Sequence, residues 1–530
     1  MLSAEVKFTP SSPARRTVDV AQLPTLGRMR ADFAEGRQDD RAGRRRWSPR
    51  TGARETGLRV GAHEVPGGLA ANEMHRVGAW ASPVTLTALL VGLGAVITVL
   101  QKAPCLSAGW GAPNVYYAGC YSDWAALYGA RGFAANPWAP FAADSTFEYP
   151  VLMSLVASVA AQITQWLPDL GFGAVEHEGP LTFWLVNLVF VLGLWAATAL
   201  LTVRMAGRRW HDGLMVAIGP GMILAGTINW DMWAVALTAW GMYVWSRGAP
   251  GRAGVLLGLG AAMKIYPVLL LGALLVLAVR RRRAGPFVRA SVGALGAWLA
   301  VNLPLMLTNP EAWSVFFTFS AERGPGLSSL WHSWNLMHEE LGLPKIEAGS
   351  LSLLALSLFV LWCLGVFVLG LAVRRTPRLA QLAFLIVAGF VLTNKVYSPQ
   401  FVLWLIPLAA LAVPRWKDVW AWMLVEALHF FAVWMYLARG ASGSAPQHSI
   451  SDETYVAAVL AHMLAVLWLC GRVVVEMVRP HLDPVRISAG GDDPLAGAYA
   501  RDAGRRPRRA ADRIPSDLPS GPSGTRRARS

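Results

Sequence analysis

The sequence predicts an all-α polytopic membrane protein, and three features support this prediction. The chain has 530 residues, of which 54% are hydrophobic and 15% are charged, and its mean hydropathy is +0.39. The charges gather in short clusters between apolar runs of about 15–25 residues, the length that a helix needs to cross a bilayer. A soluble chain of this length would instead carry a charged face along most of its helices.

The apolar runs predict about twelve transmembrane helices. They lie at residues 79–100, 149–167, 181–203, 213–228, 231–246, 253–279, 287–307, 351–373, 379–394, 399–413, 418–437 and 454–473. With the N-terminus inside the cell, the basic clusters at 280–283, 374–378 and 415–417 face the cytoplasm, as the positive-inside rule favours. The first run begins near Ala79, so we expect an uncleaved anchor rather than a signal peptide.

Two basic clusters fit this arrangement badly. The arginines that it places outside are Arg204, Arg208, Arg209, Arg247 and Arg252. In an alternative arrangement, residues 149–167 do not span the membrane and residues 253–279 fold into a hairpin, which returns these arginines to the cytoplasm. We take the first arrangement as the prediction and keep the second as its alternative.

The sequence divides into five parts. Residues 1–77 and 476–530 are rich in Arg, Pro, Gly and Ser, and we expect disordered cytoplasmic tails that favour anionic lipid. Between them we expect an N-terminal transmembrane module at 78–310 with an outer loop at 101–148, a second outer loop at 311–350, and C-terminal transmembrane helices at 351–475. Because much of the net charge of +15 lies in the tails, it does not indicate a nucleic-acid partner.

The first outer loop contains the stretch CYSDWAALYGARGF. Its spacing predicts a short amphipathic helix from Asp123 that ends before Gly132. Asp123 itself is either an N-cap or a general base. Glu148 closes the loop as a second carboxylate. Cys105 and Cys120 share the loop, where a disulfide is plausible if it is extracellular, although spacing alone leaves this open.

The second outer loop contains SSLWHSWNLM, in which Ser328 or Ser329 is able to cap another amphipathic helix. His332 and Trp334 on this helix are either interfacial residues or ligands of a phosphate or sugar. Arg323 precedes them as a further polar group on an aromatic surface.

Two lysines lie where the membrane makes charge costly. Lys395 lies in TNKVYSPQ, between two apolar runs, and is either a snorkelling hairpin residue or a cation for an anionic ligand. We favour the anion-binding interpretation because Asn394, Tyr397 and Gln400 accompany it. Lys264 interrupts another apolar run and either pairs with Asp231 of the stretch INWD or serves a ligand.

Several motifs are missing from the sequence. We find no Walker motif, no HExxH, no Cys/His cluster with zinc spacing and no GxSxG. ATP-driven transport is therefore not expected, and we predict neither a cofactor nor a metal site.

The ordered series CYSDWAALYGARGF, FEYP, INWDMW, GAAMKIYP and TNKVYSPQFVLWLIPL resembles glycosyltransferase family 87 over residues 100–415. This family of actinobacterial GT-C membrane enzymes includes polyprenol-phosphate-mannose-dependent α-mannosyltransferases. The resemblance implies a GT-C fold with a seven-span module and an active site at the outer face of the cell membrane. It also implies that the aspartate of the first outer loop, here Asp123, is the general base.

The function implied by this resemblance is transfer of a sugar, which we expect to be mannose, from a polyprenyl phosphate to an envelope glycolipid or glycan with inversion. We expect Lys395, His332, Arg131 and Lys264 to bind the donor phosphate. The expected substrate-binding residues are Glu148, Tyr149, Asn394, Tyr397, Gln400 and Trp334. The alternatives are an arabinosyltransferase with a polyprenyl-phosphate-arabinose donor, a lipid or glycan flippase, and a non-catalytic scaffold.

Overall fold

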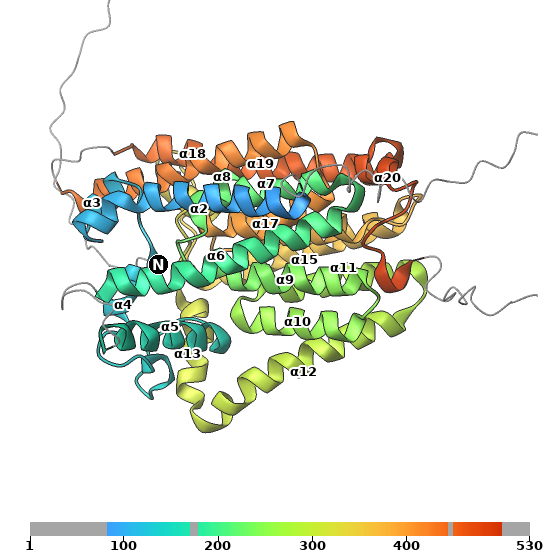
Figure 1. The fold of residues 1–530 in the computed structure, drawn as a ribbon. Helices are drawn as coiled ribbons and strands as arrows, with labels where there is room; N and C mark the ends of the chain where they lie inside the picture. Colours follow the sequence, from blue (N-terminus) through green and yellow to red (C-terminus); the bar gives the residue numbers. More distant parts are fainter. Residues whose placement is uncertain (1–81, 170–178, 444–448, 501–530) are drawn as a thin grey trace, which may run out of the picture. The chain divides into compact units, whose positions relative to one another are not determined.

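The computed structural model describes residues 82–169, 179–443 and 449–500, and every regular element in these stretches is a helix (Figure 1). The helices of eight or more residues are α2 (Pro83–Ala108), α4 (Asp123–Ala130), α5 (Val151–Asp169), α6 (Gly179–Ala206), α9 (Asp231–Ser246), α10 (Pro250–Met263), α11 (Leu270–Arg281), α12 (Ala284–Thr308), α13 (Pro310–Glu322), α14 (Leu330–Met337), α15 (Ala348–Ala372), α16 (Leu379–Thr393), α17 (Val402–Ala412), α18 (Trp416–Ala441) and α19 (Asp452–Val478). The shorter elements are α3 (Asn114–Tyr117), η2 (Ala139–Phe141), η3 (Gly207–Gly213), α7 (Leu214–Ile218), α8 (Pro220–Ala225), η4 (Tyr266–Leu269), η5 (Pro399–Phe401), η6 (Pro480–Leu482), α20 (Pro484–Ser488) and η7 (Gly497–Tyr499).

Seven segments of the described chain are long and apolar enough to cross a membrane. They are Pro83–Ala108, Val151–Pro168, Gly179–Ala225, Ala284–Thr308, Ala348–Ala372, Trp416–Ala441 and Asp452–Val478, and Leu379–Thr393 and Pro399–Ala412 are shorter apolar helices. The chain is therefore a polytopic membrane protein, as predicted. The expected total of twelve crossings and their sidedness stay predictions.

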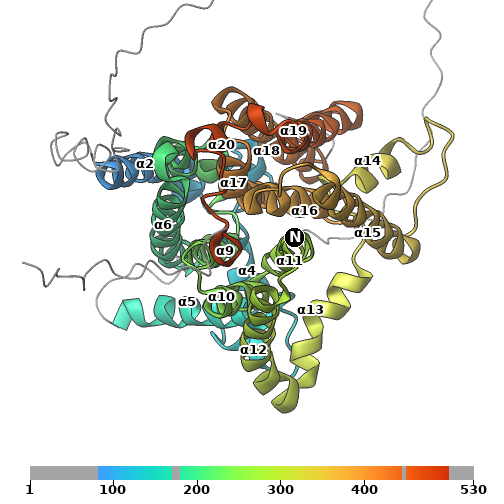
Figure 2. The same cartoon turned by 90° about the vertical axis from the view of Figure 1, so that its right-hand side faces the viewer.

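The bundle is layered by hydrophobicity. α16 and α17 are buried along almost their whole length, and Figure 2 shows them among the other helices in the end-on view. α2, α12 and α15, in contrast, expose many leucines and valines. An apolar helix that exposes such residues is suited to contact with lipid, whereas a helix covered on all sides belongs to the protein core.

The structure corrects the single span predicted at 253–279. Helix α10 ends at Met263, Lys264 is extended (φ −151°, ψ 141°), and Pro267 starts a new turn. A Cβ at Gly254 or Gly258 would overlap Ala290 or Ala294 respectively, so α10 and α12 run parallel at close range. Because α11 returns to α12 through a two-residue turn, α10 and α11 form a hairpin, as in the alternative arrangement. Pro267 has no N–H to donate to the carbonyl of Met263, so a continuous helix through this point would lose a hydrogen bond, which favours the break.

This hairpin places the basic clusters at one end of the bundle, which we call the arginine end. Arg209 donates to the carbonyl of Pro414, and Arg280 donates to the carbonyl of Val373. The ring of Trp245, at the end of α9, packs at a tilt against that of Tyr499. Segments far apart in the sequence thus bring their cations to the same level.

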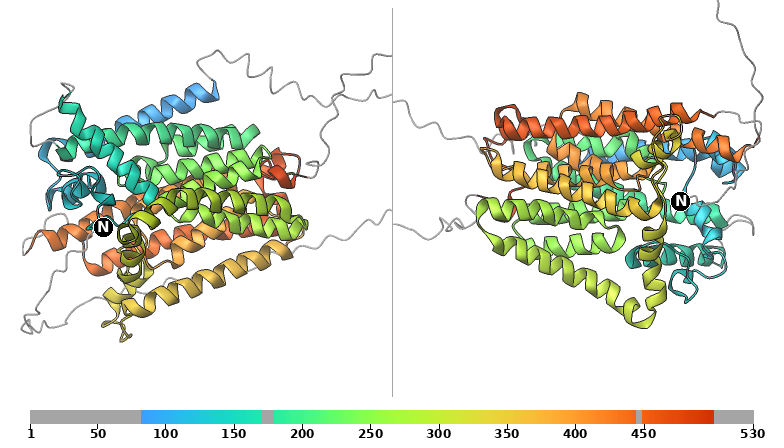
Figure 3. Two further views of the ribbon diagram at one scale, coloured as in Figure 1. Left: turned by 90° about the horizontal axis from the view of Figure 1, so that it is seen from below. Right: turned by 180° about the vertical axis from the view of Figure 1, so that it is seen from behind.

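The opposite end carries the loops and the crosswise helices. Figure 2 shows α13 lengthwise and α5 obliquely, whereas α9 and α10 are seen end on. Figure 3 shows the same arrangement from below and from behind.

The predicted helices at Asp123 and after Ser329 are confirmed as α4 and α14, whereas α13 was not predicted. Cys105 and Cys120 form a disulfide.

The predicted disordered tail at 476–530 is wrong for residues 476–500. Helix α19 continues to Val478, and η6, α20 and η7 follow. Asp483 and Arg378, which are 0% and 1% exposed in their side chains, form an ion pair. This buried carboxylate holds the segment against the bundle, which the composition of the segment does not reveal. The rest of the predicted tails, residues 1–77 and 501–530, lies outside the described residues.

Candidate active site

The backbone around Asp123 is held by long-range hydrogen bonds. The amide of Asp123 donates to the carbonyl of Ile228 at 2.8 Å, and the hydroxyl of Ser122 donates to the carbonyl of Thr227 at 2.7 Å. The ammonium of Lys102, a fully buried group of α2, donates to the carbonyl of Tyr121 at 2.8 Å. The first loop is therefore fixed to two helical segments before any ligand binds.

Asn229 joins the Asp123 carboxylate to Tyr149. Its Nδ2 donates to Oδ2 of Asp123 and to the hydroxyl oxygen of Tyr149, both at 2.6 Å. Its own Oδ1 accepts from the amide of Trp230, which fixes which way the side-chain amide faces. Asp123 is 2% exposed and Asn229 is 0% exposed. The N-cap position of α4 is Ser122, so Asp123 is not the N-cap; its carboxylate belongs instead to a buried network that spans three segments.

Tyr149 is a neutral phenol in this network, and its hydroxyl oxygen accepts from Asn229. Burial, followed by the nearby charges of Asp123 and Glu148, raises the pKa of Tyr149 well above its usual value. The phenol therefore stays protonated over the physiological range.

Lys264 and Asp231 form a second charged pair next to Tyr149. The ammonium lies 3.4 Å from Oδ2 of Asp231 and 5.1 Å from the centre of the Tyr149 ring. The other oxygen of Asp231 accepts from the indole of Trp404 at 2.8 Å. The pairing considered from the sequence is confirmed, and the α10–α11 hairpin explains it by bringing Lys264 to the start of α9.

Arg131 and Glu148 neutralise each other. The guanidinium donates from Nε and Nη2 to the two carboxylate oxygens at 2.7 and 2.9 Å. The Glu148 side chain is 0% exposed and that of Arg131 25%. A two-bond pair of this kind stabilises the closure of the first loop, and it leaves Arg131 less available to a phosphate than we expected.

Arg323 lies within electrostatic range of this network, and Lys395 lies close to Arg323. Burial lowers the pKa of Arg323, and the opposing influence comes from Tyr149, Glu148 and Asp123. In the described chain, the Arg323 guanidinium has no hydrogen-bond acceptor and lies only against the ring of Phe319. Burial, and then the positive charge of Arg323, lower the pKa of Lys395. The two cations are therefore close enough to repel each other.

The Lys395 ammonium is held by groups of two helices, α13 and α15. Its ammonium donates to the carbonyl of Ala321 at 2.9 Å and to the hydroxyl of Ser352 at 2.8 Å. The amide of Gly326 donates to the carbonyl of Lys395 at 2.8 Å. A side chain at Gly326 would press against the backbone of Val396 and Tyr397 at 3.1 Å, so glycine permits this close approach. Arg323 and Lys395 are therefore carried on joined loops.

Other expected ligands are engaged elsewhere. The His332 ring packs against Tyr436 and Tyr455, and burial lowers its pKa to about 4, which leaves it neutral at pH 7. The indole of Trp334 donates to the carbonyl of Pro344. Asn394 donates to the carbonyl of Val396. Tyr397 is 1% exposed and its ring lies 4.6 Å from that of His462.

Gln400 is also buried, at the start of the helical segment that leads into α17. Among the site residues, Asn229 and Arg323 were noted as polar groups in the sequence without being assigned a role. The INWD stretch was a usable signal for Asn229, because an amide beside a carboxylate between apolar runs needs partners. No local pattern distinguishes Arg323 from other loop arginines.

An apolar cavity adjoins the polar site. It measures about 80 Å³ and is bounded by α5, α10, α12 and α13. Pro150 and Ile265, which follow Tyr149 and Lys264 directly, belong to its lining, together with Trp298, Trp313 and Phe317. The site therefore has one charged side and one aromatic side.

The comparison with protein families agrees with this architecture. The sequence profile of glycosyltransferase family 87 matches residues 147–393. This stretch includes Tyr149, Asn229, Lys264 and Arg323, starts after Asp123 and ends just before Lys395. The comparison with curated proteins found no match. Residues 147–393 thus form a glycosyltransferase family 87 domain, and the chain that carries this domain is a membrane glycosyltransferase.

Proposed function

We propose that this enzyme transfers mannose from a polyprenyl phosphate to an envelope glycolipid or glycan at the extracytoplasmic face of the membrane. The observation that carries the proposal is that a carboxylate and a cation lie at one site. A carboxylate fixed by Asn229 lies within electrostatic range of Arg323, a half-buried cation without a hydrogen-bond acceptor in the described protein. A base and an anion-binding group are the two functions that transfer from a lipid phosphate requires.

In this mechanism Asp123 is the general base. It accepts the proton of the acceptor hydroxyl, and the hydroxyl oxygen attacks the anomeric carbon of the donor. The bond between that carbon and the phosphate oxygen breaks, and the electron pair leaves with the phosphate. A single displacement inverts the anomeric centre, so a β-linked donor gives an α-linked product.

Arg323 and Lys395 stabilise the departing phosphate. Negative charge grows on the phosphate in the transition state, and preorganised donors at that position lower the barrier. The guanidinium offers two parallel donors, which match the geometry of a phosphate better than a single ammonium does. Lys264 is held by Asp231 and serves, in this proposal, to orient Tyr149 and the sugar.

The aromatic cavity supports a lipid-linked donor. A polyprenyl chain needs an apolar path that ends at the charged headgroup, and this cavity lies beside Tyr149 and Lys264. The outward orientation of the site is supported by the arginine end, because basic clusters favour the cytoplasm and the site lies at the opposite end.

The test of the proposed function is transfer by the purified protein in lipid nanodiscs. Polyprenyl-phosphate mannose, polyprenyl-phosphate arabinose and nucleotide-linked mannose are offered separately with extracted envelope lipids. We expect product only with the lipid-linked mannose, and loss of product in Asp123→Asn but not in Asp144→Asn, an exposed acid of the same loop. Product from polyprenyl-phosphate arabinose instead would show that the transferred sugar is arabinose. An Asp123→Asn variant that remains active would show that Asp123 is not the general base.

Sidedness is tested by cysteine labelling in intact cells. In a background without Cys363 and Cys470, Glu339→Cys and Arg282→Cys place thiols at exposed sites of the two ends. We expect a membrane-impermeant maleimide to label position 339 only. Labelling of position 282 alone would place the site in the cytoplasm.

A further inference from the structure

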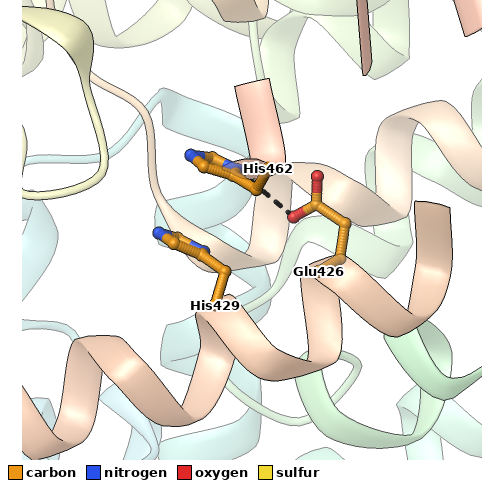
Figure 4. A group of neighbouring side chains, drawn as sticks. All are labelled: Glu426, His429 and His462. Atoms are coloured by element: carbon orange, nitrogen blue, oxygen red, sulfur yellow. Dashed lines mark ion pairs between the residues drawn. The ribbon is translucent and has the colours of Figure 1, made fainter. Parts of the chain in front are cut away.

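Three ligand-type side chains meet between α18 and α19, outside the site described above (Figure 4). They are Glu426, His429 and His462, and one potential ligand atom from each lies within 4.8 Å of the others. Their exposed fractions are 4%, 1% and 0%. Glu426 and His429 are three positions apart on α18 and therefore share one face of the helix, toward His462 of α19.

His429 is not satisfied by the protein. Neither of its ring nitrogens has a hydrogen-bond partner among the described residues. A buried polar group without a partner costs about 1–3 kcal/mol, and such groups in native structures call for an unseen ligand or another cause. The two imidazoles stack at 3.8 Å between ring centres, with 8° between their planes, which gives His429 packing without a hydrogen bond.

The outer contacts of the cluster suit metal ligation. Nδ1 of His462 lies 3.4 Å from Oε2 of Glu426, while its Nε2 faces the carbonyl of Ser328 at 3.3 Å. Oε1 of Glu426 accepts from the indole of Trp422 at 3.0 Å. Metal-bound histidine commonly donates its second nitrogen to a backbone carbonyl, and metal-bound carboxylates are themselves hydrogen-bonded. Both features are present here before an ion is added.

We propose that Glu426, His429 and His462 form a structural binding site for a divalent transition metal of the Zn²⁺ type. Two neutral imidazoles and one carboxylate are an established ligand set for zinc, with a fourth position left for water or another oxygen. Because the rings are parallel in the ion-free arrangement, one must turn to share an ion. His429 is the ring that turns, since it has no hydrogen bonds to lose.

The site has a consequence for the loops of the active site. His462 contacts Ser328 of the loop that carries Arg323, and its ring lies against Tyr397, two residues after Lys395. An ion that fixes His462 would therefore stiffen the support of both cations. This consequence rests on the proposed function, whereas the metal site does not.

The experiment measures metal rather than sugar transfer. The full chain, purified in detergent with a tag that lacks histidines, is analysed for bound metals by mass spectrometry, and after chelation it is loaded with Co²⁺ or Zn²⁺. We expect about one ion per chain, visible d–d absorption of Co²⁺, and a higher melting temperature with Zn²⁺. Glu426→Gln and His429→Ala should weaken binding by roughly 10–100-fold or more, whereas His338→Gln, a histidine of the outer loop, should bind as the wild type does.

A second variant separates the site from a purely structural cluster. In the absence of a metal site, His429→Phe keeps the ring packing and removes two unpartnered nitrogens, so its melting temperature should equal or exceed that of the wild type with and without Zn²⁺. If the metal site exists, His429→Phe loses the Zn²⁺-dependent rise. Absence of bound metal, of the Co²⁺ spectrum and of the Zn²⁺-dependent rise in wild type would overturn the proposal. Transfer activity in that protein would leave the proposed function standing.

Discussion

The two ends of the bundle treat buried charge in opposite ways. At the arginine end, the guanidinium of Arg378 is 1% exposed and donates to both oxygens of Asp483 and to the carbonyls of Leu411 and Ala412. At the loop end, Arg323 is half-buried, yet in the described chain its guanidinium has no hydrogen-bond acceptor.

The comparison shows how a structural ion pair differs from a binding group. A buried charge that is fully paired contributes to specificity of folding and is expensive to disturb. A buried charge that lacks partners is held in place by the surrounding structure and is available to a ligand of opposite charge. The five predictions below test this contrast, beginning with the largest effect.

Asp123→Asn should abolish the function of the loop end without unfolding it. The amide keeps the shape of the side chain but cannot accept the acceptor's proton, so we expect kcat to fall by about 10²–10⁴-fold. Turnover and melting temperature, measured on the same preparation, check this. A large drop in melting temperature would show that Asp123 is mainly structural.

Asp483→Asn, at the arginine end, should lower the stability of the protein without changing its activity. It leaves the Arg378 guanidinium buried against a neutral group, which costs roughly 3–5 kcal/mol of stability. Thermal unfolding in detergent should show the loss, while the KM of folded enzyme at low temperature stays unchanged. Replacing both partners with Arg378→Met and Asp483→Leu should recover much of the stability, and failure to recover would mean that the carbonyl contacts dominate.

Arg323→Gln should weaken donor binding more than folding. Loss of charge-assisted bonds to a phosphate is worth about 1.5–3 kcal/mol, or a roughly 10–100-fold rise in the KM for the lipid-phosphate donor. Arg323→Lys should recover part of the affinity because the charge remains. An unchanged KM in both variants would remove Arg323 from the site.

His332 should make stability depend on pH. Its pKa is about 4 in the folded protein and near 6.5 when exposed, so the unfolded chain binds the proton first. Stability is complete above pH 6.5 and should decrease by about 2 kcal/mol as the pH falls from 6.5 to 4. Melting curves of wild type and His332→Gln over this range should diverge. Parallel curves would assign the acid sensitivity to other groups.

The exposed pair of Arg439 and Asp452 gives the smallest effect. Their side chains are 47% and 41% exposed at 3.0 Å. Solvent screens such a pair, so Asp452→Asn should change stability by less than about 1 kcal/mol. A larger change would show that the contribution of a charged pair to stability is not set by its exposure alone.

Much of the fold follows from local features of the sequence. The lengths of the apolar runs predict the membrane class, the Asp123 and Ser329 helices are predicted by capping and spacing, and the motif series predicts the family. Each of these depends on neighbouring residues only, because hydrophobic length and helix capping are local properties.

The failures occur where distant segments meet. The break at Lys264 turns one predicted span into a hairpin, and only then does the ammonium reach Asp231. Residues 476–500 resemble a disordered tail in composition, yet Asp483 anchors them through Arg378. The pairing of Arg131 with Glu148 also depends on distant segments, and the expected binding of phosphate by Arg131 stays a prediction.

By itself the sequence determined that the chain enters the membrane, which family domain it carries and which carboxylate to examine. The tertiary structure alone decided which charges are neutralised and which remain available, and it brought Asn229 and Arg323 to the site. The physical reason is that burial in lipid depends on the number of apolar residues in a row, whereas the state of a buried charge depends on the partners that packing brings within a few ångströms.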